Sequence, residues 1–308
     1  MMETKSVSRS PATRVGLMCF LTQLTPLIPA LLVGIIAGNH AAPLEQSIWR
    51  MFFTYALNFA LFLPLMGKLL GVSLRSVWAG SKVAWRNLGY YVPICFFLTL
   101  VGFLLSVPVL NLLQVFGQQS SNELLELFGR LDRPYIIICW LLLSILIGPL
   151  YEEFFTRGLL LSALKPYGDF FAVLVSAAFF SIGHGNFSQM FVPFLSGMAW
   201  GYITLRTGSI KTAYLLHALN NAVSIIPQAL GGLTKTNILL LTPLTYIILG
   251  VIGAFLLIKH RNRVLACLRP RTEVQPEYSR RRFLLNPLIL LWPLYCIFNL
   301  ILSVRPIA

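Results

Sequence analysis

The chain has 308 residues, of which 57% are hydrophobic and only 11% are charged. Soluble domains average about 25% charged residues, and a mean hydropathy of +0.76 is typical of membrane proteins. The composition therefore excludes an ordinary soluble domain and predicts a polytopic membrane protein. The net charge of +14 does not indicate nucleic-acid binding, because the basic residues gather in loops on one side of the predicted topology.

In chain order we expect an all-α transmembrane helical bundle of about eight or nine spans. The first span follows a short basic segment without an evident cleavage site, so we expect it to be retained. The third is longer than a bilayer requires, whereas the fifth and sixth are short. The nine apolar stretches are 15–37, 51–66, 89–116, 134–164, 170–183, 190–205, 212–227, 238–258 and 284–304.

Basic residues are distributed unevenly between the two sides of this topology. Eighteen of the 24 lysines and arginines fall in loops on one side, and five fall on the other. The positive-inside rule places the basic side, and with it the N-terminus, in the cytoplasm; nine spans would put the C-terminus outside. We expect a multi-pass protein of the cell inner (plasma) membrane, in contact with the lipid bilayer.

The fourth span carries a cluster of charges, Glu152, Glu153 and Arg157. A charge at the bilayer centre costs roughly 2.5–3.5 kcal/mol, so these residues need a reason to be there. Glu153 and Arg157 are four apart and can pair on one helix face. Glu152 is turned about 100° away and lacks that partner. The spacing predicts a structural ion pair beside a free carboxylate that is available as a general base; a purely structural network is the alternative.

Two further polar elements follow in short apolar stretches. The first is Phe180-x-x-x-His184, where a lone histidine at a span end can also be an ordinary interfacial residue. The second is His217-x-x-x-Asn221, which presents an imidazole and an amide on one helix face. These two side chains can instead form hydrogen bonds between helices.

Together the elements read Glu-Glu-x-x-x-Arg, Phe-x-x-x-His and His-x-x-x-Asn, in that order. This pattern resembles the CAAX-protease and bacteriocin-processing (CPBP, or Abi) intramembrane proteases, which include the type II CAAX prenyl endopeptidases. The resemblance divides the chain into N-terminal helices over 1–133, a catalytic core over 134–227, and C-terminal helices with a basic cytoplasmic loop over 228–308.

The resemblance implies an intramembrane endopeptidase that hydrolyses a membrane-associated peptide or protein. Its motif residues imply catalytic roles and positioning roles. Water would be activated by Glu152 and His184, and the oxyanion would be stabilised by His217 and Asn221. The site would be positioned by Glu153, Arg157 and Phe180.

Several alternatives remain open at the level of sequence. No cofactor is expected, but zinc is possible, and its ligands would then be Glu152, His184 and His217. A non-proteolytic membrane scaffold of the same family and a proton-coupled transporter are the alternative functions. The protease hypothesis has one geometric difficulty. Straight helices perpendicular to the membrane would place the three motifs at different depths in the bilayer. Helix tilt, a break at Pro149 or an indented fifth helix must therefore bring them together.

Overall fold

The computed structural model describes residues 10–37, 43–79, 82–120, 134–234, 240–268 and 277–306. These residues are almost entirely helical, and long apolar helices run through the molecule. The expected all-α transmembrane bundle is therefore confirmed. Two short strands, β1 (Gln118–Ser120) and β2 (Val304–Pro306), pair antiparallel at one end of the bundle.

The elements follow the predicted spans closely. The first part of the chain forms α1 (Pro11–Leu24), α2 (Leu27–Ala37), α3 (Pro43–Leu57), η1 (Asn58–Phe62), α4 (Leu63–Leu70), α5 (Leu74–Ala79), η2 (Trp85–Asn87) and α6 (Leu88–Val115). The middle part forms α8 (Pro134–Leu141), η3 (Leu142–Ile147), α9 (Gly148–Glu153), η4 (Phe154–Leu160), α10 (Leu161–Leu164), η5 (Lys165–Tyr167), α11 (Asp169–Ile182), η6 (Phe187–Gln189), α12 (Phe191–Thr207) and α13 (Ile210–Thr234). The last part forms α14 (Leu241–Lys259), α15 (Arg261–Leu268), α16 (Arg280–Leu284) and α17 (Pro287–Leu302).

Every predicted span has a helical counterpart, but the described helices differ in length and apolarity. Five are long and apolar enough to cross a membrane: Pro11–Ile35, Gln46–Leu70, Trp85–Val115, Pro134–Tyr167 and Leu241–Lys259. The apolar helices Asp169–Ile182 and Pro287–Leu302 are shorter. The count of eight or nine spans thus stays a prediction.

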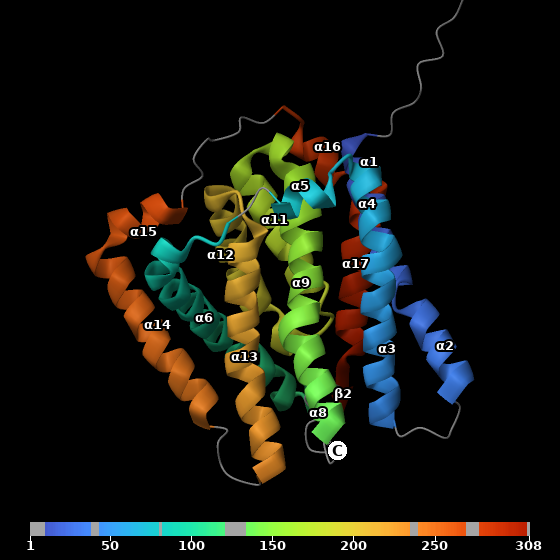
Figure 1. Ribbon diagram of the computed structural model, residues 1–308, viewed down its shortest axis with the longest axis horizontal. Helices are drawn as coiled ribbons and strands as arrows, with labels where there is room; N and C mark the ends of the chain where they lie inside the picture. Colours follow the sequence, from blue (N-terminus) through green and yellow to red (C-terminus); the bar gives the residue numbers. More distant parts are fainter. Residues whose placement is uncertain are drawn as a thin grey trace, which may run out of the picture.

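The helix that carries the glutamates runs through the middle of the bundle. Figure 1 shows α9 and α13 near the centre, α6 and α14 inclined on one side, and α3 and α17 on the other. The pair α6 and α14 packs closely because glycines face α6: a Cβ on Gly253 would lie 2.1 Å from the carbonyl oxygen of Pro93. Buried hydroxyl and amide groups also link this pair to α12 and α13, through Thr99, Ser196, Asn220 and Tyr246.

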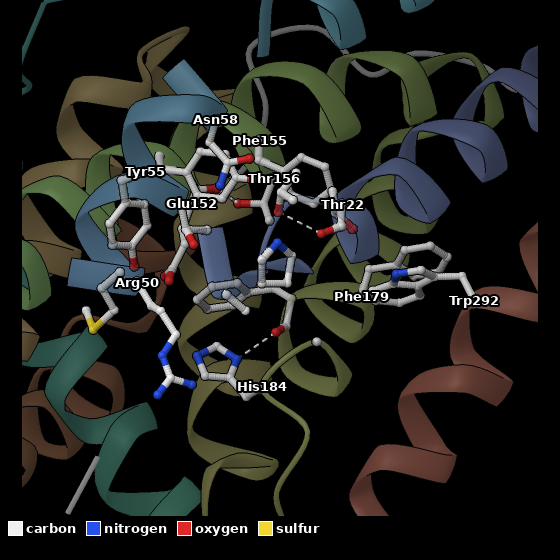
Figure 2. Close-up of a pocket in the computed structure, with 18 of the residues that line it drawn as sticks. Thr22, Arg50, Tyr55, Asn58, Glu152, Phe155, Thr156, Phe179, His184 and Trp292 are labelled. Carbon is white, nitrogen blue, oxygen red and sulfur yellow. Dashed lines mark hydrogen bonds between the residues drawn. The ribbon is translucent and has the colours of Figure 1, made fainter. Parts of the chain in front are cut away.

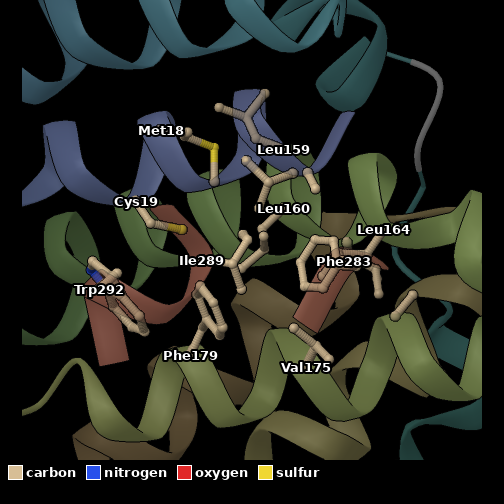
Figure 3. Packing of buried hydrophobic residues seen from close by; sticks show 14 of the residues in the cluster. Met18, Cys19, Leu159, Leu160, Leu164, Val175, Phe179, Phe283, Ile289 and Trp292 are labelled. Atoms are coloured by element: carbon tan, nitrogen blue, oxygen red, sulfur yellow. The ribbon is translucent and has the colours of Figure 1, made fainter. Parts of the chain in front are cut away.

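The largest apolar core lies between α1, η4, α10, α11 and α17. Figure 3 shows Met18 of α1, Leu160 of η4 and Ile289 of α17 packed within it. At one side of this core the rings of Phe179 and Trp292 stack with their centroids 4.3 Å apart. This core fixes α11, and therefore the end of α11 from which the second motif projects.

Glycines of α12 allow it to approach α11, as a Gly-x-x-x-Gly step in a membrane helix predicts. A Cβ on Gly201 would lie 3.0 Å from the side chain of Val173. A Cβ on Gly197 would lie 3.3 Å from the Cα of Ala177 and 3.0 Å from Nη2 of Arg157. The close approach therefore also shapes the space around the arginine of the first motif.

The basic elements α5, α15 and α16 lie toward one end of the bundle, and β2 lies toward the other (Figure 1). This arrangement agrees with the alternation of charge predicted from the loops. Some of the basic residues that entered that prediction lie outside the described residues: Lys5, Arg9, Arg130, Arg133, Lys235, Arg269 and Arg271.

Candidate active site

The two glutamates lie on a helix that is locally widened on both sides of them. The segments η3 and η4 are π-helical, and α9 between them has Pro149 in its first turn. Proline has no backbone N–H to donate, and the preceding Gly148 N–H bonds to the carbonyl of Leu143, five residues back. Such π-helical turns are frequent at functional sites. The widening changes the directions in which side chains leave this helix while leaving the helix continuous.

Glu153 and Arg157 form the predicted ion pair, and it is fully buried. Nη1 of Arg157 lies 3.0 Å from Oε1 of Glu153. The same carboxylate oxygen is 2.9 Å from Nδ1 of His217 on α13. Because the ion pair keeps Glu153 as an acceptor, Nδ1 of His217 is the donor in this contact. One carboxylate therefore ties the first motif to the third.

Aromatic rings and a hydroxyl surround the Arg157 guanidinium, which is 1% exposed. Its Cζ lies 4.6 Å from the centroid of Phe180 and 5.3 Å from that of Trp200. Nη1 also donates to the hydroxyl of Thr156 at 2.5 Å, and that hydroxyl donates to the carbonyl of Glu152. Within the described residues, Nε and Nη2 have no hydrogen-bond acceptor, so the ring faces are what the rest of this cation contacts.

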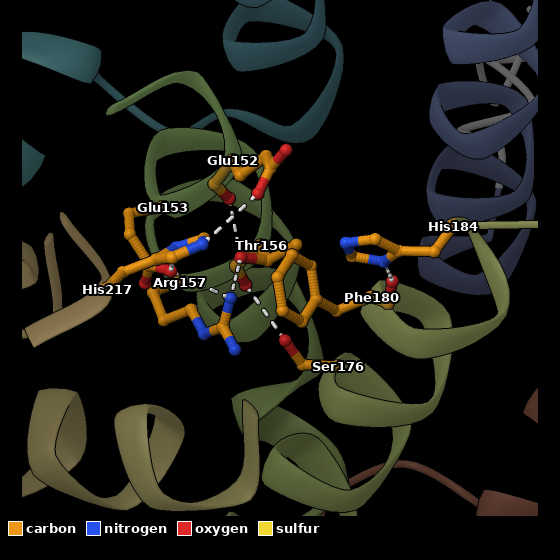
Figure 4. A network of polar contacts seen from close by, with 8 residues as sticks. All are labelled: Glu152, Glu153, Thr156, Arg157, Ser176, Phe180, His184 and His217. Atoms are coloured by element: carbon orange, nitrogen blue, oxygen red, sulfur yellow. Dashed lines mark hydrogen bonds and ion pairs between the residues drawn. The ribbon is translucent and has the colours of Figure 1, made fainter. Parts of the chain in front are cut away.

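Glu152 points in a different direction and is the accessible carboxylate of the pair. Its side chain is 29% exposed, whereas that of Glu153 is 0% exposed. Oε2 of Glu152 lies 3.5 Å from Nε2 of His217. His217 is thus held between the two carboxylates, and Trp200 stacks on its ring at 4.3 Å. Figure 4 shows this chain of contacts running from Glu152 through His217 and Glu153 to Arg157.

His184 lies just beyond the end of α11, where Gly183 and Gly185 allow the chain to turn; Gly185 has a φ of +66°. Nδ1 of His184 is 2.8 Å from the carbonyl oxygen of Phe180. A carbonyl accepts, so Nδ1 carries the proton and Nε2 of the neutral ring is an acceptor. Figure 4 shows Nε2 pointing back toward the Glu152 side of the site.

Phe180 connects the three motifs. Its ring lies edge-on to His184 at 4.9 Å and to His217 at 5.7 Å, and it lies beneath the Arg157 guanidinium. A phenylalanine at this position supplies a rigid apolar surface without an additional hydrogen-bonding group. Its contacts orient both imidazoles and the cation.

Glu152 and His184 line the same cavity, which has a volume of about 580 Å³ (Figure 2). That volume falls in the roughly 300–1,000 Å³ range of ligand sites. The cavity wall also includes Phe155, Thr156 and Phe180 from the motif-bearing helices. Residues of α1, of α2 and the turn before it, of α3 and of η1 form another part of this wall: Thr22, Thr25, Pro26, Ala30, Ser47, Arg50, Met51, Thr54, Tyr55 and Asn58.

Asn221 is a predicted catalytic residue that does not line this cavity. Its amide donates to the carbonyl oxygen of Ser144 in η3 at 3.0 Å. This contact ties α13 to the widened part of the glutamate-bearing helix. His217 is likewise absent from the described wall of the cavity and reaches it through Glu152.

The depth difficulty anticipated from straight helices does not arise. The fifth helix, α11, is only 14 residues long and ends before His184, so His184 projects from a turn inside the bundle. In the helix that carries Glu152, the π-helical segments η3 and η4 change the rotational position of the side chains around the helix axis. A short helix and two widened turns together bring Glu152 and His184 to one cavity.

Several residues around the site carry no local sequence signal. Trp200 and Thr156 are ordinary membrane-helix residues, and only their contacts with His217 and Arg157 reveal a role. Tyr55 and Arg50 lie on α3, far in sequence from the motifs, yet both line the cavity. By sequence alone Arg50 falls just before the second apolar stretch, 51–66, and its position resembles that of an ordinary loop residue.

In the part of the chain that the structure describes, no group of three His, Cys, Asp or Glu side chains is arranged to hold a metal ion. The conditional metal set of Glu152, His184 and His217 is therefore not assembled as a metal site in this geometry. His217 contacts both carboxylates, while the Nδ1 atom of His184 is bound to a carbonyl.

Comparison with known proteins agrees with the motifs. Residues 134–223 match the model of the family described as "Type II CAAX prenyl endopeptidase Rce1-like". The matched segment contains the three motifs together with η3, α9 and η4. It therefore includes the elements that carry Glu152 and His184, whereas the wall formed by α3 lies outside it.

A protein of Bacillus subtilis (strain 168), named "Putative membrane peptidase YdiL", is 26% identical to the chain over 113 residues. The match covers 36% of this chain and 45% of that relative, which is less than half the length of either. No solved structure gives a significant match. The match to the family model and this relative support a membrane protease at the level of the family.

Proposed function

We propose that the chain is an intramembrane endopeptidase that uses Glu152 and His184 to activate water against a peptide bond. The observation that supports this proposal most directly is the shared cavity: an accessible carboxylate and the acceptor nitrogen of an imidazole line one space of about 580 Å³ between apolar helices. A carboxylate and an imidazole that can both accept protons from a water are the elements of general-base hydrolysis.

In the proposed reaction, a water molecule hydrogen-bonded to Glu152 and His184 gives its proton to Glu152 as its oxygen attacks the substrate carbonyl. The protonated Glu152 then gives the proton to the leaving amine, so the carbon–nitrogen bond breaks and the carboxylate is restored. Nε2 of His217 lies 3.5 Å from Oε2 of Glu152. Glu153, Arg157 and Phe180 hold His217 and His184 in position.

Stabilisation of the oxyanion is the role we propose for His217 and Asn221. Donors directed at the developing negative charge are usually a large term in acyl transfer. His217 can serve in this way when Nε2 carries a proton, because that atom faces Glu152 and the cavity behind it. Asn221 can serve only if its amide leaves the carbonyl of Ser144, to which it is bound at 3.0 Å.

The test is peptide cleavage by the purified protein in liposomes, with a library of fluorogenic peptides. Glu152→Gln and His184→Ala should each lower kcat by roughly 10²–10⁴-fold, the usual contribution of a general base. Glu277→Gln and His260→Ala are matched controls outside the cavity and should retain the wild-type rate. Cleavage that survives both Glu152→Gln and His184→Ala would overturn the assignment.

The same assay separates the alternative functions. A scaffold cleaves no peptide at all, and a proton-coupled carrier moves solute across the liposome membrane without cleaving it. Metal dependence is tested by measuring metal content and by assaying chelator-treated protein. Full activity of metal-free protein would exclude the zinc mechanism, whereas activity restored by Zn²⁺ would favour it.

We propose further that the substrate is a membrane-associated peptide or protein and that the enzyme belongs to the inner (plasma) membrane, with its N-terminus in the cytoplasm. The collection of basic elements toward one end of the bundle supports this orientation. The lipid-facing exposure of large apolar residues, such as Leu31, Phe52 and Ile258, supports the contact with the bilayer.

A further inference from the structure

One wall of the cavity is a largely polar stripe on α3 that continues into η1. Its polar members recur mostly at intervals of three or four residues, as one face of a helix requires, and they are Ser47, Arg50, Thr54, Tyr55 and Asn58. The other face of α3 carries Trp49, Phe52 and Phe53, which are exposed and apolar. A helix with its apolar face toward lipid and its polar face toward a cavity is built to contact something polar inside that cavity.

Arg50 is the cation of this stripe. Among the described residues that line the cavity, it is the only lysine or arginine. It lies within the apolar span Gln46–Leu70, and Figure 2 shows its side chain pointing toward the ring of His184. No ion pair or hydrogen bond joins Arg50 to another described residue. The guanidinium therefore has five donors available to whatever occupies the cavity.

A second polar group of the stripe also lacks a partner. Asn58 is 2% exposed, and its Oδ1 has no hydrogen-bond partner among the described residues. A buried polar atom without a partner is destabilising unless a ligand or water supplies one. Within the described part of the chain, the exposed, unpaired guanidinium of Arg50 and the buried, unpartnered Oδ1 of Asn58 lie on one wall of a cavity that also holds Glu152 and His184. Together they indicate a ligand with both an anionic and a hydrogen-bonding group.

We propose that Arg50 determines substrate specificity by binding a carboxylate of the substrate, with the polar stripe of α3 forming the wall along which the peptide lies. This inference rests on the proposed protease function. Guanidinium and carboxylate match as a bidentate pair. Arg50 lies five residues before Tyr55, whose ring is 5.9 Å from that of Tyr151, the neighbour of Glu152.

The carboxylate is expected within reach of the Arg50 guanidinium, in the cavity that also holds His184. It can come from an acidic side chain or from the C-terminus of the substrate; both present the same chemistry to Arg50.

The experiment compares matched peptides in liposomes of zwitterionic lipid. The two peptides of the first pair are identical except that one ends in a free carboxylic acid and the other in an amide. In the second set, each pair differs by Glu or Gln at one position, and this position is varied from three residues before the scissile bond to three residues after it. The proteins are wild type, Arg50→Gln, Arg50→Lys and, as a control, Arg75→Gln, which changes an exposed arginine of α5 outside the cavity. The position that responds identifies the source of the carboxylate.

Wild type and Arg75→Gln are expected to cleave the carboxylate peptide at least about tenfold better in kcat/KM, because hydrogen bonds between charged groups are the stronger class. In Arg50→Gln this ratio should fall to about one, through KM, and Arg50→Lys should restore part of it. An unchanged ratio in Arg50→Gln, an equal loss for both peptides, or a dependence on anionic lipid alone would overturn the proposal.

Binding gives an independent readout. Fluorescence anisotropy of the same labelled peptides should show the same preference for the carboxylate, lost in Arg50→Gln. If wild type cleaves nothing but binds with this preference, the protease function fails and the carboxylate site stands. If wild type cleaves both peptides of every pair equally well, the protease function stands and the carboxylate site fails.

Discussion

At the scale of single residues, two adjacent glutamates perform different tasks because the helix turns them apart. Glu153 is fully buried and contacts Arg157 and His217, whereas Glu152 is accessible and lines the cavity. Burial makes Glu153 indispensable to its neighbours: without it, a cation that is 1% exposed loses its counter-charge. Glu152 can change its protonation without that consequence, which is what the proposed general base requires.

This difference predicts that the same substitution lowers stability at position 153 and removes activity at position 152. Glu153→Gln should destabilise the protein by about 3–5 kcal/mol, the usual cost of leaving one member of a buried ion pair alone. Glu152→Gln should leave the thermal unfolding temperature nearly unchanged while removing cleavage. Thermal unfolding of both variants in detergent, followed by intrinsic fluorescence, measures this; equal shifts for the two would contradict the division of roles.

Trp200 predicts an effect on activity from a residue that the motifs do not include. Its ring stacks on His217 at 4.3 Å and lies 5.3 Å from the Arg157 guanidinium. Such aromatic contacts contribute about 0.5–1.5 kcal/mol, so Trp200→Leu should lower kcat by up to about tenfold with little change in KM. Trp200→Phe should restore most of the rate. A loss in KM alone would show that Trp200 contacts substrate instead of positioning His217.

At the scale of elements, the site depends on departures from regular helix. The π-helical segments η3 and η4 flank the glutamates, and α11 ends early enough for His184 to leave the helix axis. The loop after α11 is held by hydrogen bonds of its own, from the Ser181 hydroxyl to the Met190 carbonyl and from Asn186 to Gln189. Close helix packing through small residues then fixes these irregular segments in place.

Glycine substitutions test that packing. Gly253→Ala would place a Cβ 2.1 Å from the Pro93 carbonyl oxygen, so α14 must move away from α6. Overpacking of this kind costs about 1–3 kcal/mol, and the unfolding temperature should fall. Gly34→Ala is the matched control, because no atom lies within 4 Å of a Cβ there. It should leave stability unchanged or raise it slightly, since alanine is the better helix former by up to about 1 kcal/mol. Similar shifts for both variants would refute the close approach of α14 and α6.

At the scale of the whole molecule, charge is segregated between the two ends of an apolar bundle. The basic elements α5, α15 and α16 lie toward one end, and the paired strands β1 and β2 lie toward the other. The cavity is bounded by α1, α3, α9 and the end of α11, among other elements, so it lies between helices from both halves of the sequence. If the proposed function holds, the orientation of the bundle decides from which side a soluble part of the substrate reaches the cavity.

Thiol labelling in intact cells tests the orientation. In a background with the five cysteines replaced, Ser76→Cys on α5 should react with a membrane-impermeant reagent only after permeabilisation. Gln119→Cys on β1 should react without permeabilisation, because it lies at the opposite end. The positive-inside rule is the reason for this expectation. The reverse pattern would place the N-terminus outside.

The sequence by itself determined the class of the protein, the approximate helical segments and the motif residues. Long apolar stretches satisfy their own backbone hydrogen bonds as helices, so composition and hydropathy suffice to predict a membrane bundle. Helical spacing likewise sufficed for the Glu153–Arg157 pair, because residues four apart share a face. The three motifs were recognisable because they interrupt stretches that otherwise avoid charge.

Only the tertiary structure decided how these residues meet. The contact between His217 and both glutamates joins segments more than sixty residues apart, and no periodicity encodes such a distance. The cavity wall on α3, including Arg50, and the stacking of Trp200 on His217 depend on helix packing. Local spacing fixes which residues share a face of one helix, but the side chains that face each other across a cavity are set by how separate helices pack.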